Sequence, residues 1–349
     1  MHLNIYRYLD SVVVFGEGSR YEVVNIVDRL NPFKVCIVTD KTILDIYRDY
    51  IEYLKRHLDI ADVIALEPGE KTKNLDIVIE LWKKFFEKGM TRKSLLIGLG
   101  GGVILDITGF VASTYMRGIP YISIPTTLLS QGDSSLGGKT GIDFIIKNGI
   151  GTFYPPEYTF IDPVFLETLP SNEFRSGFAE VIKHSIIRGG EFYRLIYNND
   201  IETIIDDKEL LKKLLRYSIE TKLEIVERDL RESGLRRLLN LGHTVGHAVE
   251  EETNYKIPHG YAVSIGLAIE ARISSVLLGF KKVDDIMDIL SRYGLPIEPN
   301  IDPMKLYMRM KNDKKNWYGK IVMTLIEDIG RCKVVEIDDI KILDILGRI

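Results

Sequence analysis

The stretch SLLIGLGGGVILD, residues 94–106, decides the fold. Its apolar first half is typical of a strand that is buried on both faces of a parallel sheet. Three successive glycines, Gly100–Gly102, then lead into an apolar segment. This order favours a dinucleotide site, because glycines let a pyrophosphate approach the backbone and a helix N-terminus supplies N–H donors. A tight turn without a ligand is the alternative. The G-x-G-x-x-G fingerprint is absent, since Val103 is the sixth residue counted from Gly98.

Similar strand and helix patterns flank this stretch. Short apolar runs predict strands at 12–18, 34–40, 62–69 and 121–127, and helical spacing of apolar residues predicts helices over 42–58 and 75–89. The alternation predicts an α/β N-terminal domain, Rossmann-like with a mostly parallel sheet, over residues 1–165. Ligands of such sheets bind beyond the carboxyl ends of the strands.

The pattern changes from about Pro170 onward. Helical periodicity dominates, so we expect a mainly α-helical C-terminal domain over residues 166–349. Only the runs 320–327 and 331–337 look like strands, as in a small hairpin. The four prolines of YPPEYTFIDPVFLETLP, residues 154–170, predict the linker between the two domains.

Composition limits the partners of the chain. Its 349 residues carry a net charge of −4, which gives no reason to expect a nucleic acid or a membrane as partner. No apolar run approaches the roughly 18 to 20 residues of a membrane span, and the first residues do not resemble a secretory signal. Cys36 and Cys332 lie far apart in the sequence and are expected to be reduced thiols. We therefore expect a cytoplasmic protein.

Histidine is concentrated in LNLGHTVGHAVEEETNYKIPHG, residues 239–260, which contains three of the six histidines. Two of them, His243 and His247, are four residues apart and share one helical face, but the glutamate of H-E-x-x-H is missing. A catalytic zinc usually has three protein ligands, and Glu180 in AEVIKH could add a carboxylate to two imidazoles. Spacing leaves open which of His243 and His247 binds metal and which acts as a base.

A second glycine-rich segment, QGDSSLGGKT, covers residues 131–140. Five residues separate Gly132 from Gly138, where the phosphate loop of NTPases has four. An NTPase is therefore not expected, although Asp133 and Lys139 are candidates for polar contacts with a ligand.

Several long motifs together resemble the 3-dehydroquinate synthase family of the sugar phosphate cyclase superfamily. They are PGEKTKNL (68–75), GLGGGVILDITGFVASTYMRGI (98–119), PTTLLSQGDSSLGGKTG (125–141), KNGIGTFYPP (147–156), LPSNEFRSGFAEVIKH (169–184) and RRLLNLGHTVGHAVE (236–250). The resemblance implies an NAD-binding first domain and a second domain that binds metal and substrate. It also implies NAD and Zn²⁺ as cofactors, with Co²⁺ as a possible substitute, a sugar phosphate as substrate, and a homodimer.

The resemblance also implies roles for individual positions. Zinc would be bound by Glu180, His243 and His259. Catalysis would involve His247, Lys183, Lys139, Asp133 and Asn240. Substrate would contact Arg117, Asn148, Lys222, Arg236 and Lys315. NAD would contact Asp40, Glu70, Lys73, Gly101, Gly102, Asp106, Thr126, Thr127, Lys139, Lys147, Phe165 and Thr168. The many cations suit a substrate that carries a carboxylate and a phosphate.

The reaction that the family implies converts 3-deoxy-D-arabino-heptulosonate 7-phosphate to 3-dehydroquinate and phosphate, in the shikimate pathway of aromatic amino acid biosynthesis. It proceeds by transient oxidation, phosphate elimination, re-reduction and aldol closure. Alternatives are another sugar phosphate cyclase, a metal-dependent alcohol or glycerol dehydrogenase, and a non-catalytic NAD sensor. Leu105 and Gly132 depart from the family pattern, where Gly and Val are usual. Leu105 raises the question of whether its side chain crowds the cofactor.

Overall fold

The computed structural model describes residues 3–311 and 319–348. The chain divides into two compact units, Met1–Leu169 and Pro170–Ile349. Each unit has its own hydrophobic core and is described by itself below.

The first unit is built on a seven-stranded sheet in the order β1-β2-β9-β6-β5-β3-β4. Every neighbouring pair is parallel except β1 and β2. The strands are β1 (Asn4–Tyr8), β2 (Ser11–Phe15), β3 (Val35–Asp40), β4 (Ile60–Leu66), β5 (Leu95–Gly100), β6 (Tyr121–Pro125) and β9 (Tyr158–Ile161). The prediction of a mostly parallel sheet in the N-terminal domain is confirmed.

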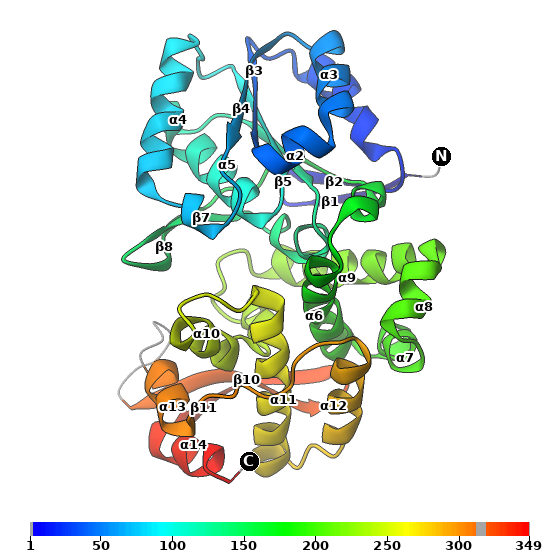
Figure 1. Cartoon of the computed structure of the whole chain (residues 1–349), viewed down its shortest axis with the longest axis vertical. Helices are drawn as coiled ribbons and strands as arrows, with labels where there is room; N and C mark the ends of the chain where they lie inside the picture. Colours follow the sequence, from blue (N-terminus) through cyan, green and yellow to red (C-terminus); the bar gives the residue numbers. More distant parts are fainter. Residues whose placement is uncertain (1–2, 312–318, 349) are drawn as a thin grey trace. The chain divides into compact units, whose positions relative to one another are not determined.

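Helices cover both faces of this sheet (Figure 1). Successive side chains of a strand point to opposite faces. In β3, Cys36 and Val38 pack in the cluster that includes α4 (Leu75–Glu87) and α5 (Gly102–Thr114). Val35 and Ile37 pack in the cluster that includes α1 (Glu22–Leu30) and α3 (Arg48–His57). This double burial explains why the strand is apolar throughout.

The strand order places the expected ligand position between β3 and β5. The chain runs from β3 to β4 on one side and then returns to β5 on the other side of β3. Such a reversal opens a crevice beyond the carboxyl ends of the two strands, where α/β sheets bind ligands. Asp40 ends β3, and Gly101 follows β5 as the N-cap of α5.

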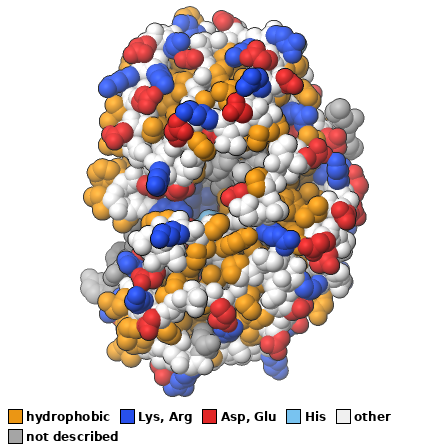
Figure 2. Space-filling view, viewed as in Figure 1, with side chains coloured by type: hydrophobic (Ala, Val, Ile, Leu, Met, Phe, Trp, Pro, Cys, Tyr) orange, Lys and Arg blue, Asp and Glu red, His pale blue; other side chains and the backbone are white. Residues whose placement is uncertain are grey.

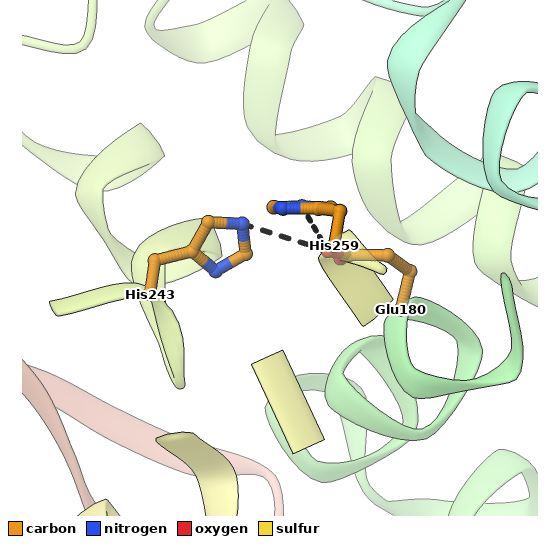
Figure 3. A group of neighbouring side chains, drawn as sticks. All are labelled: Glu180, His243 and His259. Atoms are coloured by element: carbon orange, nitrogen blue, oxygen red, sulfur yellow. Dashed lines mark ion pairs between the residues drawn. The ribbon is translucent and has the colours of Figure 1, made fainter. Parts of the chain in front are cut away.

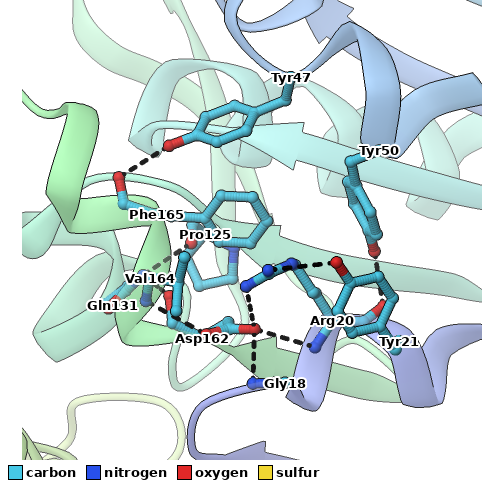
Figure 4. Close-up of polar contacts among 10 residues, drawn as sticks. All are labelled: Gly18, Arg20, Tyr21, Tyr47, Tyr50, Pro125, Gln131, Asp162, Val164 and Phe165. Atoms are coloured by element: carbon cyan, nitrogen blue, oxygen red, sulfur yellow. Dashed lines mark hydrogen bonds and ion pairs between the residues drawn. The ribbon is translucent and has the colours of Figure 1, made fainter. Parts of the chain in front are cut away.

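The linker prediction for residues 154–170 is wrong. This segment contains β9, which pairs with β2 and β6 inside the sheet. It also contains Asp162, whose carboxylate accepts hydrogen bonds from the backbone N–H groups of Gly18 and Val164 and pairs with Arg20 (Figure 4). Prolines flank the strand and leave its hydrogen bonds intact, so their number did not mark a linker.

One further helix of the first unit differs from its prediction, and one glycine-rich segment had no predicted secondary structure. The helix expected over 42–58 is broken at Tyr47 into α2 (Lys41–Ile46) and α3. The QGDSSLGGKT segment forms a single turn of π-helix, Ser130–Ser134, and then enters a separate hairpin of β7 (Lys139–Phe144) and β8 (Ile146–Phe153).

The described part of the second unit is mainly α-helical, as predicted. Its helices are α6 (Ser171–Arg188), α7 (Gly190–Asn198), α8 (Ile201–Asp206), α9 (Lys208–Arg228), α10 (His243–Glu252), α11 (His259–Leu278), α12 (Val283–Arg292), α13 (Pro303–Lys311) and α14 (Asp339–Leu346). The predicted hairpin is present as β10 (Lys320–Asp328) and β11 (Arg331–Asp338).

Helix α11 is the centre of this unit. Its 20 residues are long and apolar enough to cross a membrane by length and composition, although the sequence was not expected to contain such a segment. However, 67% of its apolar window is buried, and it packs against α6, α10, α12 and β10. Its composition is therefore explained by its position in the core of the unit.

The surface carries charges of both signs. On the face shown in Figure 2, Lys and Arg side chains are interspersed with Asp and Glu side chains over each unit. This mixture agrees with 46 basic and 50 acidic residues in the chain.

Candidate functional site

Glu180, His243 and His259 meet inside the second unit (Figure 3). One ligand atom from each lies within 4.8 Å of the others. Oε1 of Glu180 is 3.5 Å from Nε2 of His243 and 3.4 Å from Nε2 of His259. The Glu180 side chain is only 1% exposed. Two imidazole nitrogens and a carboxylate oxygen that converge in this way form a cluster able to hold a divalent cation.

Close backbone contacts position the helices that carry this cluster. A side chain at Gly266 of α11 would place its Cβ 1.8 Å from the carbonyl oxygen of Gly242, directly before α10. A Cβ at Gly260 would lie equally close, 1.8 Å, to the carbonyl oxygen of Ser176 on α6. The buried Glu270 of α11 accepts a hydrogen bond from the N–H of Gly242 at 2.6 Å and so caps α10. The cluster therefore rests on three helices in direct backbone contact.

The geometry separates His243 from His247, which spacing could not do. His247 is not in the group of three converging ligand atoms. Its ring lies beside the cluster, with its centroid 5.4 Å from that of His243 and 6.4 Å from that of His259.

The two imidazoles of the cluster have opposite pKa shifts. Burial, reinforced by the nearby Lys183, holds the pKa of His243 well below its ordinary value. Burial would also lower the pKa of His259, but its hydrogen bonds with Glu180 and Glu250 outweigh that effect and raise the pKa to about 9. His243 is therefore neutral at neutral pH and presents a lone pair.

Several basic and amide side chains from the predicted catalytic and substrate-binding sets lie in the same unit. Lys183, Lys222 and Arg236 are all buried, and Lys183 pairs with Glu180. A guanidinium N–H of Arg236 donates to the carbonyl of Leu230 at 2.6 Å, and Asn240 donates to Glu232. Lys315 lies outside the described residues.

The loop that carries Arg236 is organised by Asp229, a residue that the sequence did not single out. Asp229 accepts hydrogen bonds from the N–H groups of Ser233, Gly234 and Arg236 at 2.7 to 3.0 Å. Partial desolvation opposes ionisation of Asp229, but these donors prevail and lower its pKa to about 2. An Asp followed by a Ser-Gly pair is a turn signal that could have indicated this loop.

In the first unit, the glycine triplet lies against two hydroxyl-bearing residues. A Cβ at Gly101 would lie 3.1 Å from Cγ2 of Thr127, and one at Gly102 would lie 3.0 Å from Oγ of Ser134. Thr126 and Thr127 follow the end of β6, and Asp40 caps α2 by accepting from Ile43 N–H at 2.9 Å. Ser134 belongs to the QGDSSLGGKT motif but was not among the predicted site residues.

Lys73 joins three segments of the first unit. Its ammonium lies 2.6 Å from Oδ2 of Asp106 on α5, 2.5 Å from Oδ1 of Asn148 in the hairpin, and 4.0 Å from Oε1 of Glu70. Its carbonyl accepts a hydrogen bond from Asp143 N–H at 2.7 Å. Burial would lower the pKa of Lys73, but Asp106 and Glu70 raise it. The predicted cofactor residues 70, 73 and 106 thus form one ionic cluster with Asn148.

The remaining predicted residues of this unit fall into two groups, with Arg117 outside both. Phe165 and Thr168 are joined by Tyr47, which donates to the Phe165 carbonyl at 2.9 Å and also contacts Thr168 (Figure 4 shows the first bond). Asp133 lies in the π-helical turn, Lys139 begins β7, and Lys147 is in β8. Arg117 stands apart, because it lies beyond the C-terminal end of α5 whereas Gly101 caps the N-terminal end.

The two departures from the family pattern are both accommodated inside the first unit. Leu105 is 5% exposed within α5, so its side chain is directed into the protein. Gly132 is buried in the π-helical turn.

Comparisons with known proteins agree over most of the chain. Residues 63–176 match the family model described as 3-dehydroquinate synthase N-terminal, and residues 177–316 match the one described as 3-dehydroquinate synthase C-terminal. The 3-dehydroquinate synthase of Pyrococcus furiosus is 45% identical over 335 residues, which cover 96% of this chain and 97% of that protein. The enzyme of the same name from Pyrococcus abyssi is 43% identical over 93% of this chain and 96% of its own length.

Solved structures give the same fold. A 2-deoxy-scyllo-inosose synthase complexed with carbaglucose-6-phosphate, NAD⁺ and Co²⁺ has a TM-score of 0.88 at 22% identity, covering 99% of this chain and 100% of that one. The 2-epi-5-epi-valiolone synthase of Streptomyces hygroscopicus, with NAD⁺ and Zn²⁺ bound, has a TM-score of 0.85 at 26% identity, covering 100% and 99%. With residues 63–316 matched by its two family models and relatives matched over nearly their full length, this chain belongs to the 3-dehydroquinate synthase family.

Proposed function

We propose that this protein converts 3-deoxy-D-arabino-heptulosonate 7-phosphate to 3-dehydroquinate and inorganic phosphate, using NAD⁺ and a divalent metal. The observation that carries the proposal is the convergence of Glu180, His243 and His259 beside the buried Lys183, in a chain of this family. The substrate would be oxidised at one hydroxyl, lose phosphate next to the new ketone, be reduced again and close by an intramolecular aldol reaction.

The donor set fits a divalent metal. Two imidazoles and one carboxylate are typical of catalytic zinc sites, which keep a further coordination position for substrate. We assign Zn²⁺ to Glu180, His243 and His259, with Co²⁺ as a substitute. When bound, the metal supplies Lewis-acid polarisation of the substrate hydroxyl and NAD⁺ supplies reversible oxidation of that carbon.

The dinucleotide is assigned to the first unit. The N-terminus of α5 presents backbone N–H groups without a side-chain cap, as a pyrophosphate requires. The carboxylate of Asp40 lies at the adjacent strand end, where a ribose hydroxyl is bound in this class of fold. The Lys73 cluster would fix Glu70 and Asp106 toward the same ligand.

The side chains of the second unit would bind the two anionic ends of the substrate. Arg236 offers a planar guanidinium, which suits a carboxylate, while Lys183 and Lys222 are point charges suited to a phosphate. His247 would move the proton that leaves the carbon next to the ketone, because it lies beside the cluster without belonging to it.

Phosphate release with a catalytic amount of NAD⁺ tests the reaction. We expect one phosphate per heptulosonate 7-phosphate consumed, many turnovers per NAD⁺, and no steady rise of free NADH. Continuous accumulation of NADH would instead indicate an alcohol dehydrogenase. Turnover of glucose 6-phosphate in place of the heptulosonate would indicate a cyclase for neutral sugar phosphates.

Metal content of single variants tests the ligand assignment. His259→Ala and His243→Ala should each lose the metal and the activity while NAD⁺ binding is retained. His247→Ala should keep the metal and lose activity, because we assign it the proton and not the ion. Loss of metal in His247→Ala with retention in His243→Ala would exchange the two roles.

A further inference from the structure

A second buried carboxylate lies behind one of the two imidazoles. The side chain of Glu250 on α10 is 3% exposed, and its Oε1 is 3.1 Å from Nδ1 of His259. The other ring nitrogen of His259, Nε2, is 3.4 Å from Oε1 of Glu180. The imidazole therefore spans two carboxylates, one at each nitrogen, and only Glu180 belongs to the converging group.

This placement determines which nitrogen of His259 can bind a cation. A neutral imidazole carries one proton, and the nitrogen that binds a metal must be the one without it. A carboxylate at Nδ1 accepts the N–H there, so the proton that a metal would displace is the one on Nε2. The same bond fixes the rotation of the ring about its side chain.

Local structure explains why a residue only nine positions away can do this. Glu250 follows His243 by seven residues, so both lie on one face of α10. The chain then reverses through Asn254 and Tyr255, both with left-handed φ (52° and 56°), and Tyr255 N–H donates to the Glu250 carbonyl at 2.8 Å. Helix α11 begins at His259, four positions after Tyr255.

The other imidazole is held differently. Nδ1 of His243 is 3.1 Å from the backbone carbonyl oxygen of Leu241. That acceptor belongs to the backbone, so no substitution can remove it. The acceptor for His259 is a side chain and can be exchanged.

We propose that Glu250 is a positioning residue for the metal site, which holds the His259 Nδ1–H so that Nε2 is directed at the ion. The inference rests on the proposed metal assignment and extends it to a residue outside the ligand set. A carboxylate acceptor makes the imidazole a stronger donor to the metal than a neutral acceptor does. Glu250 therefore sets both the direction and the strength of one ligand.

Metal competition measures this role without using activity. The metal-depleted protein is titrated with Zn²⁺ in the presence of a chromogenic chelator. Glu250→Ala should weaken Zn²⁺ binding by about 10- to 100-fold, the usual effect of losing such a partner. Glu250→Gln keeps the shape and one acceptor oxygen, so its loss should be smaller. The visible absorption of the Co²⁺-loaded protein should also change in Glu250→Ala, because the ligand geometry is altered.

The matched control is Glu252→Ala on the same helix. Glu252 pairs at the surface with Arg309 and Lys305, at 3.0 and 3.4 Å. Its replacement by Ala should leave Zn²⁺ affinity and the Co²⁺ spectrum unchanged. The inference is overturned if folded Glu250→Ala binds Zn²⁺ with wild-type affinity and shows the wild-type Co²⁺ spectrum. If Glu250→Ala does not fold, wild-type Zn²⁺ affinity and a wild-type Co²⁺ spectrum in Glu250→Gln overturn it instead. Failure of the wild-type protein to bind one Zn²⁺ would instead overturn the proposed metal assignment.

Discussion

Asp162 in the first unit and Glu180 in the second are both buried carboxylates, but their neighbours differ in kind. Asp162 accepts from the backbone N–H groups of Gly18 and Val164 and pairs with the guanidinium of Arg20 at 2.7 Å (Figure 4). Glu180 faces two imidazole nitrogens (Figure 3). It also pairs with the ammonium of Lys183.

The difference shows which buried carboxylate can become a ligand. A backbone N–H or a guanidinium always donates and never offers a lone pair. The groups around Asp162 can therefore only donate hydrogen bonds to its carboxylate. Through these bonds Asp162 connects the N-terminal segment to the end of β9. An imidazole nitrogen can donate or bind a cation, depending on its proton. The imidazoles around Glu180 allow a metal to take the place of protons.

The largest effect is expected at Glu180. Glu180→Gln keeps the volume and an oxygen for Lys183 but removes the anionic ligand. Metal should be lost, and phosphate release should fall by more than about 100-fold, beyond what a positioning partner contributes. Metal analysis and steady-state assays check this, and thermal unfolding with a chelator should be nearly unchanged. Full metal retention would show that Glu180, like Asp162, has only a structural role and is not a metal ligand.

The next largest effect concerns stability. Asp162→Asn replaces one of the two acceptor oxygens by an NH₂ group, which leaves the N–H of either Gly18 or Val164 without its buried acceptor. We therefore expect a loss of about 1–3 kcal/mol in the free energy of unfolding. Metal content should not change. Urea unfolding measures the effect. Asp45→Asn is the control, since Asp45 pairs with Arg48 in a bridge whose side chains are 71% exposed, and it should cost less than about 0.5 kcal/mol.

Lys73 offers an intermediate case, a buried ammonium between Asp106 and Asn148. Lys73→Met keeps the apolar length of the side chain and removes the charge. Charge-assisted hydrogen bonds contribute about 1.5–3 kcal/mol, so the Kd for NAD⁺ should rise by about tenfold or more. Calorimetry measures the change. Unchanged NAD⁺ affinity together with lower stability would show that this cluster only fastens the fold, as Asp162 does.

The smallest effect is expected at Asp229, which has backbone donors like Asp162 but lies near the surface. Asp229→Asn should loosen the loop of Arg236 and raise KM for the sugar phosphate by about tenfold, with little change in kcat. A kcat loss without a KM change would contradict this role for the loop.

The two aspartates should also differ in the sign of their pH dependence. The pKa of Asp229 is lowered from 3.8 to about 2, so its stabilisation is present above pH 3.8 and is lost as the pH falls toward 2. Burial raises the pKa of Asp162 above 3.8 despite Arg20, so the unfolded chain ionises first and stability is lost as the pH rises above 3.8. Acid unfolding of Asp229→Asn and Asp162→Asn beside the wild type would detect the opposite signs.

The parts of the fold that sequence could predict are those in which a pattern has one structural cause. Continuous apolar runs such as 34–40 exist because both faces of β3 are buried, and the glycine triplet marks the turn into α5. The segment 154–170 misled because its prolines flank β9 and lie outside its hydrogen-bonded residues. The break at Tyr47 carries neither Gly nor Pro and left no signal.

The metal cluster was only partly accessible from sequence. Spacing placed His243 and His247 on one helical face, but the contact with Glu180, some 60 residues earlier, depends on tertiary packing. In the sequence, Glu250 and Glu270 look like solvated charges on helices. Only the structure shows that both are buried and that they accept hydrogen bonds from His259 and from the N–H of Gly242. The only local signal for the role of Glu250 was its spacing, since it follows His243 by seven residues and so lies on the same helical face.

The backbone contact between Gly266 and Gly242 has a kinetic consequence. Because α10 and α11 touch through their main chains and Glu270 caps α10, the directions of His243 and His259 are set by the fold itself. Uptake of the proposed metal should then require no folding step. The loading rate should rise linearly with metal concentration and should follow the rate at which each ion exchanges its own water. Gly266→Ala, which separates the helices, should introduce a slow phase that does not depend on the ion.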